Sequence, residues 1–262
     1  MVSELSGVVR LGISGPVGQV TLSHPGKFNA VSRTMWRELK AVFEAIQRDQ
    51  ALRCVVVQGE GDHFCSGGDI SEYAQFRFAE PSLRAFHESD VWGGLQALLD
   101  CDVPIIAKIS GNCMGAGLEI ASCCDFRLAA ESARFGAPIA KLGFPMAPRE
   151  AALVLRAVGE HTARDMLLAA SVFGAREMAD RGFLNSVWPE PALPAAVQAL
   201  TERVSRLAPA AARQNKQSFR ALVTAFNGSL ATELIVNAYQ YADSAEHREG
   251  IAAFTEKRTS RF

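Results

Sequence analysis

The order of apolar and polar residues predicts alternating strands and helices up to about residue 192. Residues 8–13 and 19–23 have the short apolar runs of strands, and Gly15-Pro16 marks a turn between them. Ser32 is placed to cap a helix that continues to about Arg48, because apolar residues recur beyond it at helical spacing. The apolar residues expected on the core-facing side of this helix are Met35, Leu39, Val42, Phe43 and Ile46.

Three further runs, at residues 54–57, 104–110 and 125–128, are strand-like, and small-residue loops and helix-like segments recur around them. The sequence itself has no convincing internal repeat. Alternation of this kind is typical of a β/α architecture. We therefore predict an α/β fold for residues 1–192.

The strand pattern ends at about Leu193, and residues 193–262 form a separate helical region in the prediction. Successive helices are expected at residues 193–207, 213–226 and 230–242, with breaks at Pro209 and Gly228. Their apolar content exceeds what an isolated helical tail could bury, so they must pack on something. Either the rest of the chain or a neighbouring subunit could provide that surface.

Composition and charge exclude several classes of partner. The chain has 262 residues, of which 48% are hydrophobic, and a net charge of −1, which gives no reason to expect nucleic acid or an anionic membrane as a partner. No apolar run approaches the roughly 18 residues needed to span a bilayer. The first residues lack the basic and apolar regions of a secretory signal, so we expect a cytoplasmic protein.

The six cysteines lack the paired spacing of a zinc site or a disulfide framework. We expect them to act as small apolar residues in a reducing compartment, and we predict no metal and no bound cofactor. Cys65 is the exception, because it lies in a loop of small residues. It would be a nucleophile only if a base such as His63 activated it.

Two turns of small residues carry the candidate chemistry. Gly115-Ala116-Gly117 follows the strand at 104–110 and precedes a helix that begins with Leu118-Glu119, and residues 66–70 follow the strand at 54–57 in the same way. Small residues at a helix start leave backbone N–H groups accessible to a ligand oxygen, although tight packing alone would also favour them. Two such turns could each donate one N–H to a single carbonyl oxygen, as in an oxyanion hole.

Five motifs, at residues 64–70, 111–119, 124–125, 135–138 and 249–258, occur in the order seen in the crotonase superfamily. From residues 24–30 to its C-terminus the chain resembles the enoyl-CoA hydratase/isomerase family. The resemblance implies an α/β spiral of ββα turns with a C-terminal helical oligomerisation region. It also implies an acyl-CoA substrate and a homotrimer or a dimer of trimers.

The resemblance assigns roles to particular residues. The N–H groups of Gly68 and Ala116 would hold the thioester oxygen, and Glu119 occupies the first of the two positions where family hydratases carry a glutamate. Helix dipoles also favour a purely structural glutamate in a first turn. Lys27 is expected near the CoA phosphates, and Phe254 and Lys257 would approach CoA from the C-terminal segment. The other predicted contacts are Phe28, Ser66, Gly67, Asp69, Ile70, Gly115, Pro138, Ile139 and Lys141.

The chain departs from the family pattern at the second glutamate, where it has Ile139 after Pro138. If residues 138–141 are extended, Lys141 shares the face of Ile139 and is a candidate replacement. Glu150 is another, although a glutamate that merely opens a helix is the alternative. A missing acid or base typically costs about 10²–10⁴ in rate.

Hydration of a 2-enoyl-CoA is the best functional label for this sequence. Other enolate reactions on a CoA thioester are the alternatives: decarboxylation, thioester hydrolysis, C–C cleavage or isomerisation, the last disfavoured because family isomerases tend to keep a glutamate where this chain has Ile139. A third hypothesis is a CoA-thioester binding protein that has lost its chemistry.

Overall fold

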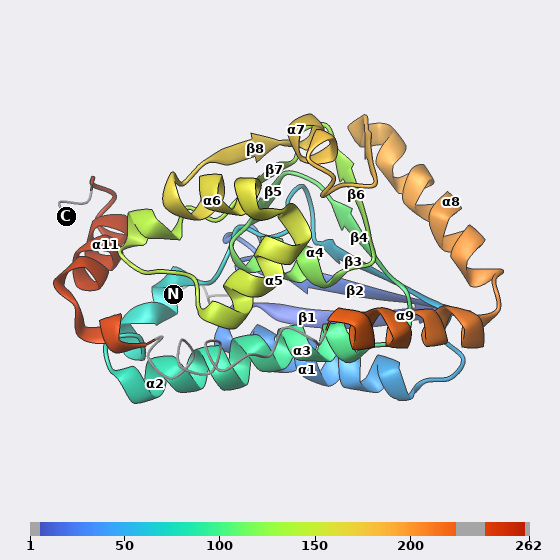
Figure 1. The fold of residues 1–262 in the computed structure, drawn as a ribbon, viewed down its shortest axis with the longest axis horizontal. Helices are drawn as coiled ribbons and strands as arrows, with labels where there is room; N and C mark the ends of the chain where they lie inside the picture. Colours follow the sequence, from blue (N-terminus) through green and yellow to red (C-terminus); the bar gives the residue numbers. More distant parts are fainter. Residues whose placement is uncertain (1–5, 224–238, 260–262) are drawn as a thin grey trace.

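The computed structural model describes residues 6–223 and 239–259, and a six-stranded sheet lies at its centre (Figure 1). β1 and β2 form an antiparallel hairpin, and every later strand of this sheet joins its neighbour in parallel. The strands predicted from the sequence are confirmed, with small changes at their ends. In spatial order the sheet consists of β1 (Val8–Ser14), β2 (Val17–Ser23), β3 (Cys54–Gly59), β4 (Ile105–Ile109), β6 (Phe126–Ala130) and β9 (Ser186–Trp188).

A second sheet of three strands gives the chain its spiral course. β4 and β5 are consecutive in sequence, yet β4 belongs to the large sheet and β5 to the small one, and β6 and β7 divide in the same way. Helix α4 (Ala116–Cys123) follows the first pair and α5 (Pro148–Val158) follows the second. This strand–strand–helix turn is the fold that the resemblance implied. The small sheet contains β5 (Asn112–Met114), β7 (Arg134–Gly136) and β8 (Val172–Gly174).

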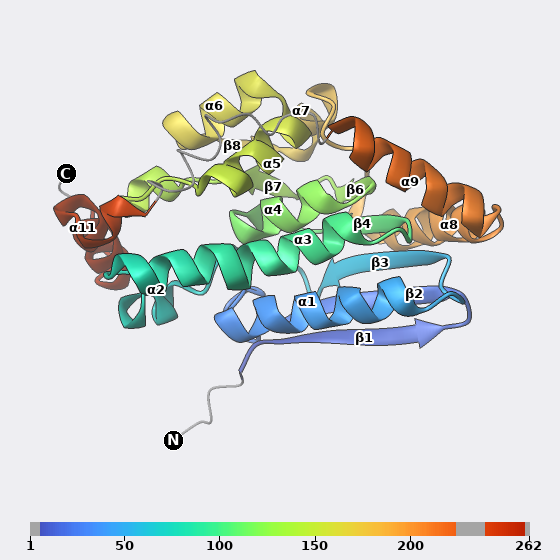
Figure 2. The same cartoon turned by 60° about the horizontal axis from the view of Figure 1, so that its bottom comes forward.

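Two rows of helix lie side by side along one side of the large sheet. Helices α2, η2 and α3 follow one another without a break and lie along α1 (Figure 2). The Ser32 hydroxyl accepts the Met35 N–H at 3.2 Å, so the predicted helix cap is confirmed. The predicted core-facing residues are buried except Val42, which is half-buried, and each large apolar side chain contributes roughly 1.5–3 kcal/mol. The elements are α1 (Arg33–Arg48), α2 (Glu80–Ala85), the π-helix η2 (Phe86–Val91) and α3 (Trp92–Asp100).

The C-terminal helices α8 (Leu193–Ser205) and α9 (Pro209–Val223) pack on the chain's own body. The apolar side of α8 covers residues of β3, β4 and β6 on the face of the sheet opposite α1. On α9, Lys216 pairs with Asp125 at 2.7 Å and Arg220 pairs with Asp102 at 2.5 Å. Of the two surfaces on which these helices could pack, the chain's own body is therefore observed. Packing on a neighbouring subunit in a trimer stays a prediction.

Helix α9 starts earlier than residue 213, because proline suits the first position of a helix. Most of the predicted helix at 230–242 falls outside the described residues. In its last part, residues 240–243 form a short 3-10 turn, and α11 (Ala245–Thr255) follows it. None of the helices in the described part of the chain has the length and apolar character that a membrane crossing requires.

Helix α11 lies at one end of the molecule (Figure 1). It packs on η3 (Ile139–Leu142), a single turn of 3-10 helix that follows β7. A side chain at Gly250 would overlap the backbone of Leu142, so glycine permits the close approach of α11 to η3. The C-terminal segment thereby becomes a wall of the cavity described next.

Candidate active site

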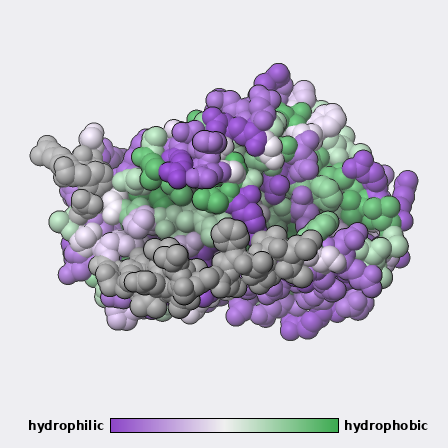
Figure 3. Space-filling view, viewed as in Figure 1, coloured by the Kyte–Doolittle hydropathy of each residue, from purple (hydrophilic) through white to green (hydrophobic). Residues whose placement is uncertain are grey.

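A cavity of about 600 Å³ lies between the two small-residue turns, α4, α5, η3 and α11. Apolar side chains gather between α5 and α11 on the face of the molecule that Figure 3 shows. All but one of the residues predicted to act on substrate line this cavity. The exception is Lys257, which lies exposed beyond the end of α11. The lining includes Lys27, Phe28, Ser66, Gly67, Gly68, Asp69, Ile70, Gly115, Ala116, Glu119, Pro138, Ile139, Lys141 and Phe254.

The two turns are held side by side by backbone hydrogen bonds. The Cys65 N–H donates to the Asn112 oxygen at 2.8 Å, and the Met114 N–H donates back to the Cys65 oxygen at 2.9 Å. These bonds form a parallel bridge between the loop that follows β3 and the strand β5. Gly115 then adopts a φ of +47°, which an L-residue rarely tolerates, and brings the second turn against the first.

Each turn presents one backbone N–H to the cavity. Val31 bonds to both neighbours of Gly68, accepting from the Asp69 N–H at 2.9 Å and donating to the Gly67 oxygen at 2.8 Å. Gly68 itself donates to no other described residue. Ala116 is the first residue of α4, where an N–H has no partner within the helix. Two donors without a described partner on adjacent turns are compatible with an oxyanion hole, which stays a prediction.

Tyr73 stands directly beside the first of these donors. A side chain at Gly68 would overlap the Tyr73 hydroxyl, so glycine leaves room for both the ligand oxygen and the phenol. Burial raises the pKa of Tyr73 to about 12, and it therefore remains a neutral phenol at physiological pH. Residue spacing does not identify Tyr73 as a site residue, because its position depends on the short 3-10 helix η1 (Ile70–Gln75) that follows the turn.

Two buried carboxyl groups line the same cavity. Glu119 lies in the first turn of α4 with 7% of its surface exposed, and Glu150 lies in the first turn of α5 with 3% exposed. Glu150 thus opens a helix, as one alternative had it, and it also lines the cavity, while its role as the replacement carboxylate stays a prediction. The structure brings a second carboxyl group to the site from a position eleven residues beyond Ile139 in the sequence.

Burial raises the pKa of both carboxyl groups. Desolvation is the largest cause for each, and the negative charge of Glu150 raises the pKa of Glu119 further. The positive charge of Arg77 opposes this shift at both residues, and the backbone at Ala147 also favours the ionised form of Glu150. Two carboxyl groups in one dry cavity cannot both ionise readily, so near neutral pH one of them keeps its proton.

The residues that match known proteins extend well beyond this cavity. The sequence profile of the enoyl-CoA hydratase/isomerase family matches residues 12–262. The chain belongs to the enoyl-CoA hydratase/isomerase family. It is an enzyme of that family, as the sequence predicted.

Individual relatives cover nearly the whole chain. A probable enoyl-CoA hydratase of Rhizobium meliloti is 32% identical over 95% of each chain. The 2,3-dehydroadipyl-CoA hydratase of Escherichia coli is 30% identical over 93% of each chain. A solved enoyl-CoA hydratase/carnithine racemase from Magnetospirillum magneticum is 34% identical, with a TM-score of 0.81 over 97% of this chain and 95% of that one. These similarities confirm the predicted fold class and family.

His87 holds the second carboxyl group of this family member. Its Nδ1 lies 3.0 Å from Glu150 Oε1, and its ring stacks on Tyr239 with centroids 5.5 Å apart. Burial, with a smaller effect of Arg77, lowers the pKa of His87 well below its usual value, so the ring is neutral. His87 belongs to the π-helix η2, and a π-turn that presents a polar residue to a site is not recognisable from residue spacing.

Residues 138–141 are not extended, so the condition under which Lys141 would share the face of Ile139 is not met. Pro138 begins the 3-10 helix η3, and Gly143 ends it at a φ of +74°. The two-residue alternation of a strand therefore does not apply, although Ile139 and Lys141 both line the cavity. Ile139 is an apolar part of the wall at the position where family hydratases have their second glutamate.

Lys27 and two aromatic residues lie at the open end of the cavity. The Lys27 ammonium group donates to Asp69 Oδ2 and to the Ser71 hydroxyl, each at 2.8 Å. Phe28 and Phe254 also line the cavity, with exposed fractions of 58% and 54%. These positions suit contacts with the polar part of a CoA thioester, which stay predictions.

Cys65 does not have the surroundings of a nucleophile. It is fully buried, and burial raises the pKa of its thiol to about 12. The nearby base candidate His63 instead accepts the Asn112 N–H at its Nδ1, at 3.1 Å. Among residues 6–223 and 239–259, no group of three or more His, Cys, Asp or Glu side chains is arranged to bind a metal ion.

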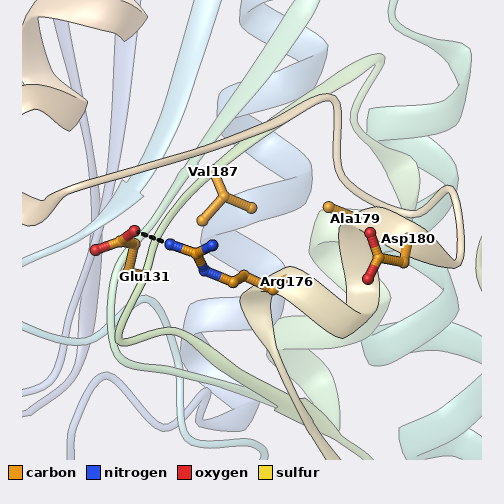
Figure 4. Close-up of a pocket in the computed structure, with 5 residues that line it drawn as sticks. All are labelled: Glu131, Arg176, Ala179, Asp180 and Val187. Carbon is orange, nitrogen blue, oxygen red and sulfur yellow. Dashed lines mark hydrogen bonds and ion pairs between the residues drawn. The ribbon is translucent and has the colours of Figure 1, made fainter.

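A second hollow, of about 350 Å³, lies between α7 (Ala175–Asp180) and β9 (Figure 4). In it Arg176 points toward Glu131 and pairs with it at 2.7 Å, while Asp180 lies apart from this pair. Both partners are well exposed, and an exposed ion pair contributes little. This hollow contains neither of the small-residue turns and neither buried carboxyl group.

The contact between Gly68 and Tyr73 yields a direct test of the first N–H donor. We expect Gly68→Ala to lower kcat by about 10²–10³, because the new methyl group must displace the turn or the phenol, and a displaced oxyanion donor costs about that much. Tyr73→Phe alone provides the matched control. If the rate is lost because the new methyl group overlaps the Tyr73 hydroxyl and displaces the turn, the double variant Gly68→Ala, Tyr73→Phe should recover part of it. A double variant no faster than Gly68→Ala would contradict this explanation.

Proposed function

We propose that this protein adds water to the double bond of a 2-enoyl-CoA, with Glu119 and Glu150 as its acid–base pair. The observation that carries the proposal is the second carboxyl group in the cavity. Glu150 supplies the acid or base that is missing at Ile139, and it lies in the same desolvated space as Glu119 and the free N–H groups. With Glu150, the mechanism that uses two carboxyl groups has both of them.

The proposed reaction begins with the thioester oxygen between the N–H groups of Gly68 and Ala116. One ionised carboxylate removes a proton from water, and the water oxygen bonds to the β-carbon as the double-bond electrons move toward the carbonyl. The two N–H groups stabilise the negative charge that develops on the enolate oxygen, at roughly 2.7–4 kcal/mol for each donor. The protonated carboxyl group then gives its proton to the α-carbon, which completes the addition of water.

The surroundings favour Glu150 as the base and Glu119 as the acid. The backbone at Ala147 stabilises the ionised form of Glu150, and no backbone group does the same for Glu119 in the described structure. His87 can donate its Nδ1 proton to an ionised Glu150 or accept a proton from a neutral one. This contact fixes the direction of the Glu150 side chain in either state.

The remaining parts of the prediction belong to this proposal. Lys27, Lys141, Lys257 and Phe254 are expected to bind the CoA portion, and the resemblance supports a trimer or a dimer of trimers. Burial of all six cysteines without disulfides supports a reducing, cytoplasmic location. Decarboxylation, thioester hydrolysis, C–C cleavage, isomerisation or binding without turnover are the other outcomes of the assay below.

Removal of either carboxyl group should stop most turnover but not binding. We expect Glu119→Gln and Glu150→Gln each to lower kcat by about 10²–10⁴, because glutamine keeps the shape and cannot transfer a proton. Affinity for the substrate should change by only a few fold. A panel of 2-enoyl-CoA and other CoA thioesters, followed by mass spectrometry for gain of water, loss of carbon dioxide or release of CoA, provides the measurement.

Glu131→Gln is the matched control for this experiment, since Glu131 is exposed and lies outside the cavity. A Glu150→Gln variant with near-normal hydration would remove Glu150 from the mechanism and contradict the proposed pair. Wild-type protein that releases carbon dioxide or CoA and adds no water would replace hydration with the corresponding alternative reaction.

The raised carboxyl pKa values also predict how stability changes with pH. The unfolded chain loses these protons near the usual glutamate pKa, whereas the folded protein retains them to higher pH, so the unfolded state binds fewer protons in between. The free energy of unfolding therefore falls as pH rises through this interval. We expect Glu119→Gln to stabilise the protein, with a larger gain at pH 8 than at pH 5.

Thermal denaturation of wild type, Glu119→Gln and the control Glu131→Gln across this pH range measures the effect. The gain should be specific to the cavity residue, because Glu131 is exposed. A gain for Glu119→Gln that is independent of pH would show that Glu119 ionises as an ordinary carboxyl group in the folded protein.

A further inference from the structure

The cavity contains a buried arginine that the proposed addition of water does not use. Arg77 lines the cavity with 1% of its surface exposed. Its guanidinium carbon lies 4.3 Å from the centre of the Tyr73 ring and 4.0 Å from the centre of the Phe144 ring. The guanidinium group is therefore held by two aromatic faces, which leave the N–H groups at its edge available for hydrogen bonds.

Only part of this edge is engaged by the protein. Arg77 Nε donates to His247 Nε2 at 3.4 Å, and Nη2 donates to the Tyr241 hydroxyl at 3.2 Å. Both acceptors are neutral, since His247 has a pKa lowered to about 4, chiefly by burial, and burial raises the pKa of Tyr241. Arg77 Nη1 has no hydrogen-bond partner among the described residues. This nitrogen is not among the side-chain atoms that lack a hydrogen-bond partner and are also fully closed to solvent. It is therefore accessible from the cavity.

No described carboxylate forms an ion pair with Arg77. Glu119 and Glu150 line the same cavity, but neither forms an ion pair with Arg77 in the described structure, whichever of them is ionised. Glu88 is engaged elsewhere, because it accepts the Tyr239 hydroxyl at 2.5 Å and pairs with Arg149 at 3.3 Å. A buried cation without a counter-ion is unfavourable, and buried charges in proteins are normally paired. The cavity therefore contains a positive charge that no carboxylate of the described residues pairs with.

We propose that Arg77 binds a free carboxylate on the acyl group, so that the substrate is the CoA thioester of a short dicarboxylic 2-enoic acid. This inference rests on the proposed function for the position of the thioester. A guanidinium edge matches the two oxygens of a carboxylate, and aromatic walls exclude the water that would otherwise weaken the pairing. Arg77 is then a specificity-determining residue.

The arrangement of Tyr73 limits the length of this acyl group. The Tyr73 hydroxyl lies against Gly68 at the oxyanion hole, and Arg77 lies over the face of the same ring. The thioester carbonyl and the free carboxylate must therefore bind about one aromatic ring apart. Only a few carbon atoms can separate them, and a long fatty acyl chain would leave the cation unpaired.

The experiment compares matched pairs of substrates. Hydration is measured with the CoA thioesters of 2-pentenedioic and 2-hexenedioic acid, and with those of 2-pentenoic and 2-hexenoic acid, which lack the free carboxylate. We expect wild type to prefer the better dicarboxylic thioester by at least about 10²-fold in kcat/KM, because a neutral tail leaves a buried donor unpaired. Arg77→Met should abolish this preference, and Arg77→Lys should retain part of it.

Binding provides a readout that does not depend on turnover. Titration calorimetry with the saturated pentanedioyl-CoA and pentanoyl-CoA should show the same preference in wild type and its loss in Arg77→Met. Arg176→Met, in the second hollow, is the matched control, and thermal denaturation establishes that each variant is folded. If Arg77→Met does not fold, the substrate preference of wild type and its change in Arg77→Lys still test the role of Arg77.

The outcomes distinguish this inference from the function on which it rests. Equal or better use of the monocarboxylic thioesters by wild type, or an equal loss of both classes in Arg77→Met, would overturn the role of Arg77. A preference for pentanedioyl-CoA that depends on Arg77, without hydration of any 2-enoyl thioester, would uphold carboxylate recognition and overturn the proposed hydration.

Discussion

The site depends on the backbone bridge between Cys65 and Cys113, which joins two turns that are distant in sequence. Without that pairing the N–H groups of Gly68 and Ala116 would belong to separate loops, and neither alone could stabilise an enolate as two converging donors do. The spiral makes this contact possible, because the consecutive strands β4 and β5, like β6 and β7, divide between the large sheet and the small sheet. The cavity then forms around the bridge, and α11 completes its wall.

Burial gives this cavity its electrostatic character. A glutamate, a histidine or an arginine in water would keep its ordinary protonation state, but here desolvation favours neutral carboxyl groups and a neutral imidazole. Arg77, which is buried beside these groups, stays charged at any physiological pH. In the proposed reaction, the two carboxyl groups that hold at least one proton and the Arg77 cation suit a substrate that is activated at its carbonyl and negatively charged at its other end.

Local sequence patterns predicted the elements that local interactions determine. The strands, the Ser32 cap and both small-residue turns follow from spacing and from residue type, and five ordered motifs were enough to indicate the family. His87, Tyr73 and Arg77 could not be found in this way, because the π-helix η2 positions His87, the short 3-10 helix η1 positions Tyr73, and Arg77 lies in the turn that follows η1. Glu150 was a candidate from its position after Pro148, but only the packing of α5 against α4 decides that its carboxyl group enters the same space as that of Glu119.

A crystal structure with a bound 3-hydroxyacyl-CoA product tests the central claim most directly. We expect the thioester oxygen to accept the N–H groups of Gly68 and Ala116, and the new hydroxyl group to lie within hydrogen-bond distance of both Glu119 and Glu150. A product bound with its hydroxyl group against Ile139, and with Glu150 turned away and bonded only to His87, would contradict the pairing of the two carboxyl groups.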